Sequence, residues 1–112
     1  MPWPTEVRLN PERDLLTVAF DDGARFALRA EYLRVESPSA EIRNHGGPKT
    51  ILTGKQAVKI DGLEPVGNYA LRIGFDDGHD SGLFSWDYLH KLGAEEDRIW
   101  ADYLAAVKAK TA

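Results

Sequence analysis

The side chains that could do chemistry in this sequence are a few histidines, carboxylates and serines. His45 and His79 follow loop or turn sequences, and Glu41, Asp77 and Asp80 could add oxygen ligands beside them. Two histidines and one carboxylate form the smallest common set for a non-haem iron site, provided that the ligands converge. Their spacing does not enforce convergence, so metal binding through His79 is one hypothesis among several.

Other catalytic patterns lack the context that their chemistry requires. No serine lies in a Gly-x-Ser-x-Gly elbow. Asp21 and Asp22, like Asp76 and Asp77, precede a glycine in turn sequences, where carboxylates are solvated rather than buried. The glycine-rich stretch 44–50 ends in Lys-Thr but lacks the spacing of a P-loop. The sequence therefore predicts no catalytic constellation, and an enzyme of unknown class is the weakest hypothesis.

Composition narrows the class of protein further. With 112 residues, 43% of them hydrophobic and 29% charged, the chain predicts a single globular domain over residues 1–112. A net charge of −4 argues against nucleic acid and anionic membranes as partners. The absence of cysteine excludes disulfides, zinc–thiolate sites and iron–sulfur ligation by this chain. Because neither a signal peptide nor a membrane-spanning run is recognisable, we expect a cytoplasmic protein.

The elements that must position these side chains occur in a repeated order. Leu16–Gly23 matches Leu71–Gly78, and the Tyr-Leu of 32–33 recurs at 88–89. Each copy predicts a strand, an Asp-Asp-Gly turn, a second strand and a short helix, with His79 standing where the first copy has Ala24. The expected strands are 7–9, 15–20, 25–28, 57–63, 69–75 and 81–84, and the expected helices are 30–35 and 86–92. We predict an α+β fold built from antiparallel β-hairpin units with short helices.

Three segments shape the rest of the prediction. Residues 37–54 are rich in glycine and proline and predict a long loop, of a kind that is often functional. Residues 65–68 predict a turn, and Gly93 fits the end of the second short helix, for which Ser85 is the expected N-cap. Residues 95–108 predict an amphipathic C-terminal helix that packs on the core, with binding of a partner as the minority reading.

Three ordered motifs carry a family resemblance: YLRVESPSAE at 32–41, PVGNYAL at 65–71 and DGHDSGLFSW at 77–86. From about residue 6 to residue 92 the chain resembles the gamma-butyrobetaine hydroxylase-like N-terminal domain family. The resemblance implies an accessory domain, found ahead of a catalytic oxygenase domain or attached to iron–sulfur carrier proteins. It carries no oxygenase activity by itself.

The resemblance also implies a zinc site made of three cysteines and one histidine. The cysteine positions correspond here to Ser37, Ser39 and Ile42, and only His79 remains. A serine hydroxyl is a poor zinc ligand, so we expect the site to be lost and His79 to become a hydrogen-bonding anchor for the Ser37 loop. Zinc or iron held by His79 with ligands other than cysteine is the alternative.

We therefore predict a non-catalytic accessory or protein-interaction module that has no cofactor and binds a protein partner. A homodimer formed through exposed strand edges, Trp3 or Trp86 is a further hypothesis. The candidate interaction surface consists of Arg34, Ser37, Ser39, Glu41, His45, Asn68, Tyr69, His79 and Trp86.

Overall fold

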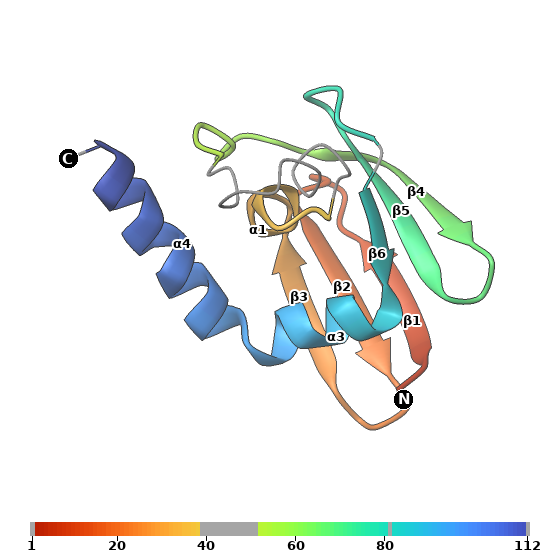
Figure 1. Cartoon of the computed structure of the whole chain (residues 1–112). Coiled ribbons are helices and arrows are strands. Elements are labelled where there is room, and N and C mark those ends of the chain that lie inside the picture. Colours follow the sequence, from red (N-terminus) through yellow and green to blue (C-terminus); the bar gives the residue numbers. More distant parts are fainter. Residues whose placement is uncertain (1, 39–51, 81, 112) are drawn as a thin grey trace.

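The computed structural model describes residues 2–38, 52–80 and 82–111, which form two three-stranded antiparallel sheets and three helices. The first sheet has the order β1 (Pro4–Leu9), β2 (Leu15–Phe20), β3 (Arg25–Arg29). The second has the order β4 (Ile60–Val66), β5 (Ala70–Phe75), β6 (Gly82–Ser85). The helices are α1 (Ala30–Val35), α3 (Trp86–Ala94) and α4 (Glu96–Thr111) (Figure 1). The predicted α+β class is confirmed.

Each sheet and the helix that follows it form one copy of the repeated unit. The turns match closely, because Gly23 has φ 90° and Gly78 has φ 92°, a conformation that glycine adopts without strain. The Asp22 carboxylate accepts the Ala24 backbone N–H at 2.9 Å, and the Asp77 carboxylate accepts that of His79 at 3.1 Å. The repeat seen in the sequence is therefore a repeat in three dimensions.

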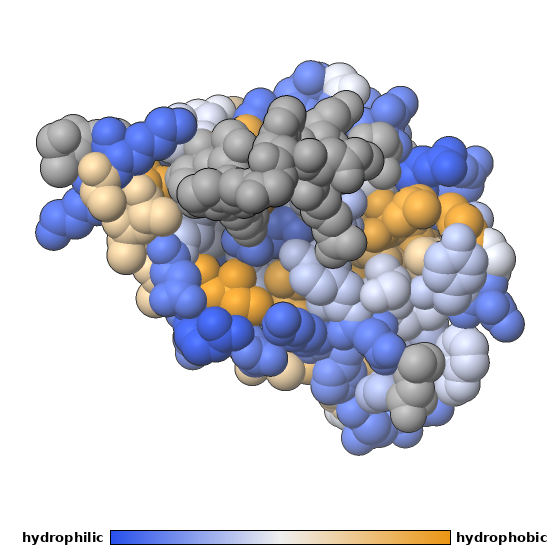
Figure 2. All heavy atoms as spheres, in the orientation of Figure 1, coloured by the Kyte–Doolittle hydropathy of each residue, from blue (hydrophilic) through white to orange (hydrophobic). Residues whose placement is uncertain are grey.

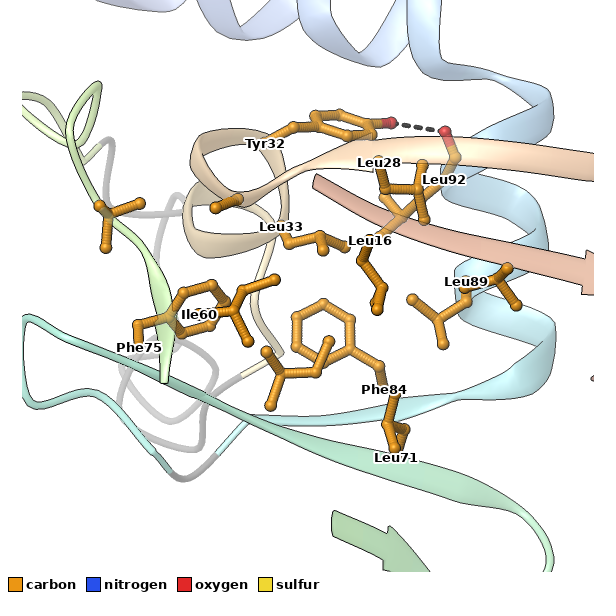
Figure 3. Close-up of a cluster of buried hydrophobic side chains, with 14 of the residues drawn as sticks. Leu16, Leu28, Tyr32, Leu33, Ile60, Leu71, Phe75, Phe84, Leu89 and Leu92 are labelled. Atoms are coloured by element: carbon orange, nitrogen blue, oxygen red, sulfur yellow. Dashed lines mark hydrogen bonds between the residues drawn. The ribbon is translucent and has the colours of Figure 1, made fainter. Parts of the chain in front are cut away.

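The two units hold each other through reciprocal contacts. The Tyr32 hydroxyl donates to the Leu92 carbonyl oxygen at 2.7 Å (Figure 3), and the Tyr88 hydroxyl donates to the Glu36 carbonyl oxygen at 2.5 Å. These are equivalent positions of the two units, so each helix is bonded to the end of the other. Contacts of this reciprocal kind are what a two-fold relation between identical subunits produces.

The turns take part in the same exchange. Arg34 on α1 donates from Nε to the Asp77 carboxylate of the second unit at 2.8 Å. His90, the equivalent residue on α3, lies with Nε2 2.8 Å from the Asp22 carboxylate of the first unit. Each helix therefore reaches the Asp-Asp-Gly turn of the other unit, and one shared core forms between them.

That core is made by both sheets and by the helices α1 and α3. Its apolar side chains come from alternating positions of the strands, as expected for strands with one buried face. Removing this apolar surface from water is the main stabilising term of the fold. The most deeply buried members include Leu16, Leu28, Tyr32, Leu33, Ile60, Phe84, Leu89 and Leu92 (Figure 3).

Strand β4 differs from the prediction. It begins at Ile60 rather than at residue 57, and it continues through Pro65 to Val66, where a turn was expected. Proline lacks the backbone N–H needed inside a sheet, but β4 lies at the edge of its sheet and pairs only with β5. The edge position therefore tolerates Pro65.

Helix α3 also ends later than predicted. Ser85 is the N-cap, as expected, and its hydroxyl accepts the Tyr88 backbone N–H. Gly93 does not end the helix, which continues to Ala94. A Cβ atom on Gly93 would lie 2.2 Å from Cγ of Phe26, so this glycine allows α3 to approach β3.

Helix α4 covers residues 96–111, against the predicted 95–108, and extends away from the two sheets (Figure 1). The Trp100 ring packs edge-on against Tyr32, with ring centroids 5.9 Å apart. Farther along, Leu104 is 50% exposed, so only the first part of α4 packs on the core as predicted. No helix in the described part of the chain is long and apolar enough to cross a membrane.

Candidate functional site

Strand β5 separates the predicted surface into two regions. Tyr69 precedes this strand and His79 follows it, and a strand of six residues spans roughly 20 Å. Ser39, Glu41 and His45, and the family's cysteine position Ile42, lie outside the described residues. Of the other candidates, one end of β5 has Arg34, Ser37 and His79, and the other has Asn68, Tyr69 and Trp86.

The first region is an ion-pair network around Asp77. One oxygen of its carboxylate accepts from Arg34 Nε and from Lys55 Nζ, both at 2.8 Å. The other accepts the backbone N–H of His79 at 3.1 Å. Burial would raise the pKa of the Asp77 carboxyl, but the hydrogen bonds from Lys55, His79 and Arg34 outweigh it and lower the pKa to about 2. Asp77 therefore stays ionised and ties α1 to the turn.

Ser37 and His79 form the hydrogen bond that the sequence analysis expects, with Oγ and Nε2 2.9 Å apart. A serine and a histidine in this arrangement could form a nucleophile and its base. However, Ser37 is only 2% exposed, and a Cβ on Gly82 would lie 2.2 Å from its Oγ. Because the hydroxyl packs this closely on β6, it has no room for a substrate atom on that side and serves as an anchor.

The described residues bring no group of three histidine, cysteine or carboxylate side chains together in a way that could hold a metal. Of the predicted metal ligands, the structure describes His79, Asp77 and Asp80. His79 Nε2 contacts Ser37, and the Asp77 carboxylate is paired with Arg34 and Lys55. The described part of the chain therefore does not support the metal alternative.

The second region is a hollow of about 130 Å³, here called the aromatic hollow, at the start of α3. Trp3 and Tyr69 are 46% and 57% exposed there. The turn of the first unit holds the backbone of Trp3. The backbone N–H of Trp3 donates to the Asp21 carboxylate at 3.0 Å, and its backbone carbonyl oxygen accepts the Asp21 backbone N–H at 2.8 Å. The hollow is lined by Trp3, Asn68, Tyr69, Ser85, Trp86 and Asp87.

Only part of this hollow is predictable from the sequence. Asn68, Tyr69 and Trp86 are predicted surface residues, whereas Trp3 is predicted only as a dimer contact. Trp3 precedes the first sheet and Trp86 follows the second, so the two residues meet only because the two units pack against each other. Asp87 had no distinguishing signal, because an acidic residue is common in the first turn of any helix.

Two larger hollows were also not predicted. One of about 490 Å³ lies on the outer face of the second sheet, where Gly62 pairs with Gly74 and Leu63 and Leu83 contribute apolar surface. The other, of about 300 Å³, lies between α3 and α4. The face drawn in Figure 2 has two separate areas of hydrophobic atoms, with hydrophilic atoms between them. Both hollows are lined by charged side chains of both signs, so their charge does not point to one ligand.

The motifs that carry the resemblance extend over both units and both regions. Residues 7–90 match the family model described as gamma-butyrobetaine hydroxylase-like, N-terminal. The chain belongs to this family. The matched range ends at the residue that pairs with Asp22, so the gamma-butyrobetaine hydroxylase-like N-terminal domain comprises the two repeated units, and α4 follows it.

Solved structures agree with this assignment. One solution NMR structure is 46% identical to the chain, with a TM-score of 0.86, and the match covers 99% of this chain and 88% of that one. A second solution NMR structure is 43% identical, with a TM-score of 0.85, and the match covers 100% of this chain and 84% of that one. A crystal structure of a protein of unknown function in the DUF971 family, from Acidithiobacillus ferrooxidans, is 39% identical with a TM-score of 0.69, covering 82% of this chain and 93% of that one. No curated protein matches the chain significantly.

Proposed function

We propose that this member of the gamma-butyrobetaine hydroxylase-like N-terminal domain family is a non-catalytic interaction module that binds a protein partner through the aromatic hollow. The observation that carries the proposal is the exposure of Trp3 and Tyr69 around that hollow, 46% and 57%. Tryptophan and tyrosine are enriched among the residues that dominate binding energy at protein interfaces. Apolar surface rimmed by polar groups is typical of such sites.

The region around Asp77 supports the same proposal by contrast. Its charged groups bind one another, and its serine is buried against β6. These contacts account for the motif residues Arg34, Asp77 and His79 as parts that hold the two units together. At the other end of β5, the side chains of Trp3 and Tyr69 have no comparable structural task, because they are 46% and 57% exposed. Trp86 beside them is half-buried and packs against the core.

The test is site-specific photo-crosslinking in cells that express the full chain. A photoreactive phenylalanine analogue at Tyr69 is expected to form a discrete adduct with one protein, and Trp86→Ala in the same chain should remove it. Leu83 and Leu104, which are 38% and 50% exposed, provide matched control positions away from the aromatic hollow. Equal labelling from Tyr69 and the controls, or no adduct at Tyr69, would contradict the proposal.

A further inference from the structure

The aromatic hollow has a counterpart in the first repeated unit. A hollow of about 140 Å³ lies at the start of α1, as the aromatic hollow of about 130 Å³ lies at the start of α3. The residue before the middle strand is Asp14 in one and Tyr69 in the other. In the first unit the third strand ends at Arg29 and the helix begins with Ala30 and Glu31. In the second unit the third strand ends at Ser85 and the helix begins with Trp86 and Asp87.

Trp3 also has an equivalent in the other unit, which is Lys59. Each of these residues directly precedes the first strand of its sheet. Each donates its backbone N–H to the first aspartate of the turn at 3.0 Å, Trp3 to Asp21 and Lys59 to Asp76. The two hollows can therefore be compared position by position on one backbone.

The hollow of the first unit supplies its own cations. Asp14 is 3.7 Å from Lys59 Nζ, and Glu31 is 4.0 Å from the Arg29 guanidinium. That guanidinium also lies over the Trp100 ring, 4.2 Å from its centroid. An arginine is thus held between a carboxylate and an aromatic face.

The aromatic hollow keeps the carboxylate and lacks the cations. Asp87 occupies the position of Glu31, whereas Ser85 and Trp3 stand where the first unit has Arg29 and Lys59. Within the described part of the chain Asp87 has no ion-pair partner at salt-bridge distance. The hollow instead gains three aromatic rings, whose faces attract cations.

An anion is a poorer occupant, although helix starts often bind anions. The Trp86 N–H already donates to the Tyr69 carbonyl oxygen at 3.2 Å, and the Tyr88 N–H donates to the Ser85 hydroxyl at 3.1 Å. The Asp87 carboxylate would also repel an anion. The charge and the rings of this hollow are therefore complementary to a cation.

We infer that the aromatic hollow binds an arginine side chain of the protein partner, with the guanidinium against the rings of Trp3, Tyr69 and Trp86 and paired to Asp87. This inference rests on the proposed function and names the chemistry of its partner. Arginine is favoured over lysine because its planar, weakly hydrated guanidinium stacks on aromatic rings and binds a carboxylate at the same time.

The test is a titration of the full chain with blocked Gly-Arg-Gly peptide. Binding is monitored through the NMR shifts of the Trp3 and Trp86 indole N–H groups. The matched peptide carries citrulline, which has the same shape without the charge. We expect the arginine peptide to bind about tenfold more tightly than the citrulline peptide. Asp87→Asn should remove this preference, whereas Glu31→Gln, the equivalent change in the other hollow, should leave it intact.

The inference is overturned if arginine and citrulline peptides bind equally, or if Asp87→Asn binds arginine as the parent chain does while its spectrum shows a folded protein. Equal binding together with a Tyr69 adduct would leave the interaction module standing and reject only the arginine. A clear preference for arginine without any adduct would instead reject the protein partner and retain the guanidinium site.

Discussion

At the scale of single residues, Asp77 shows how a turn carboxylate becomes a structural group. Its first-unit equivalent, Asp22, makes the same backbone hydrogen bond in its turn. Asp77 in addition accepts from two permanent cations, Arg34 and Lys55, and its side chain is 20% exposed against 40% for Asp22. Removing one partner of an ion pair that is better shielded from water costs more stability than removing one partner of an exposed pair.

We expect Asp77→Asn to lower the free energy of unfolding by about 1–2 kcal/mol at pH 7. The folded-state pKa of about 2 lies below the ordinary value of 3.8, so the folded protein binds fewer protons than the unfolded chain between these values. The stabilisation is therefore complete above about pH 5 and is lost as the pH falls through about 4 toward 2. Urea unfolding of both proteins between pH 3 and pH 7 measures this difference.

The control is Asp22→Asn, which changes the equivalent carboxylate of the more exposed pair with His90. Its effect at pH 7 should be smaller than that of Asp77→Asn. Equal losses in the two variants, or a loss for Asp77→Asn that does not depend on pH, would show that the charge network is not the cause.

At the scale of elements, the two units solve the same packing problem in opposite ways. In the second unit a glycine on the helix, Gly93, makes space for Phe26 of the strand. In the equivalent contact, Ser37 follows α1 at the position of Gly93, and the glycine lies instead on the strand, where Gly82 makes space for Ser37. Each close contact therefore requires a glycine on one of its two sides.

This arrangement predicts that Gly93→Ala destabilises the protein, by about 1–3 kcal/mol through overpacking against Phe26. In an open helix the same change would be favourable by nearly 1 kcal/mol, because alanine is the better helix former. Thermal unfolding separates these two outcomes by sign. The double variant Phe26→Leu/Gly93→Ala should recover part of the loss, and additive effects of the two changes would argue against direct contact.

The same glycine explains an error at the end of α3. From sequence, Gly93 after a helical run favours a C-cap, and nothing local distinguishes a capping glycine from a packing one. Helix α1 was predicted with its observed bounds, because a strand, a helix-forming run and a proline delimit it locally. Strand β4 was misplaced because the tolerance of Pro65 depends on an edge position that local sequence does not specify.

At the scale of the whole molecule, the fold is a pair of fused units with reciprocal contacts and different surfaces. The end of β5 that holds His79 is occupied by contacts between the units, and the other end exposes aromatic rings. A homodimer through strand edges, Trp3 or Trp86 remains a prediction.

We expect untagged protein purified without chelator to contain no stoichiometric zinc or iron. The described residues bring no three ligands together, and Ser37 and His79 bind each other. Elemental analysis of the parent chain and of His79→Ala tests this prediction. Metal near one equivalent that disappears in the variant would instead establish the metal alternative, with ligands other than cysteine.

The sequence by itself determined the strand and helix order, the repeat, the family and the absence of thiolate chemistry. These follow from local patterns, since alternation, turn glycines and helix caps act over a few residues. Only the tertiary structure decided that the predicted surface separates at β5 and that Trp3 joins Tyr69 and Trp86. The physical reason is that a hollow is made by residues distant in sequence, whose meeting depends on strand pairing and on how the two units pack.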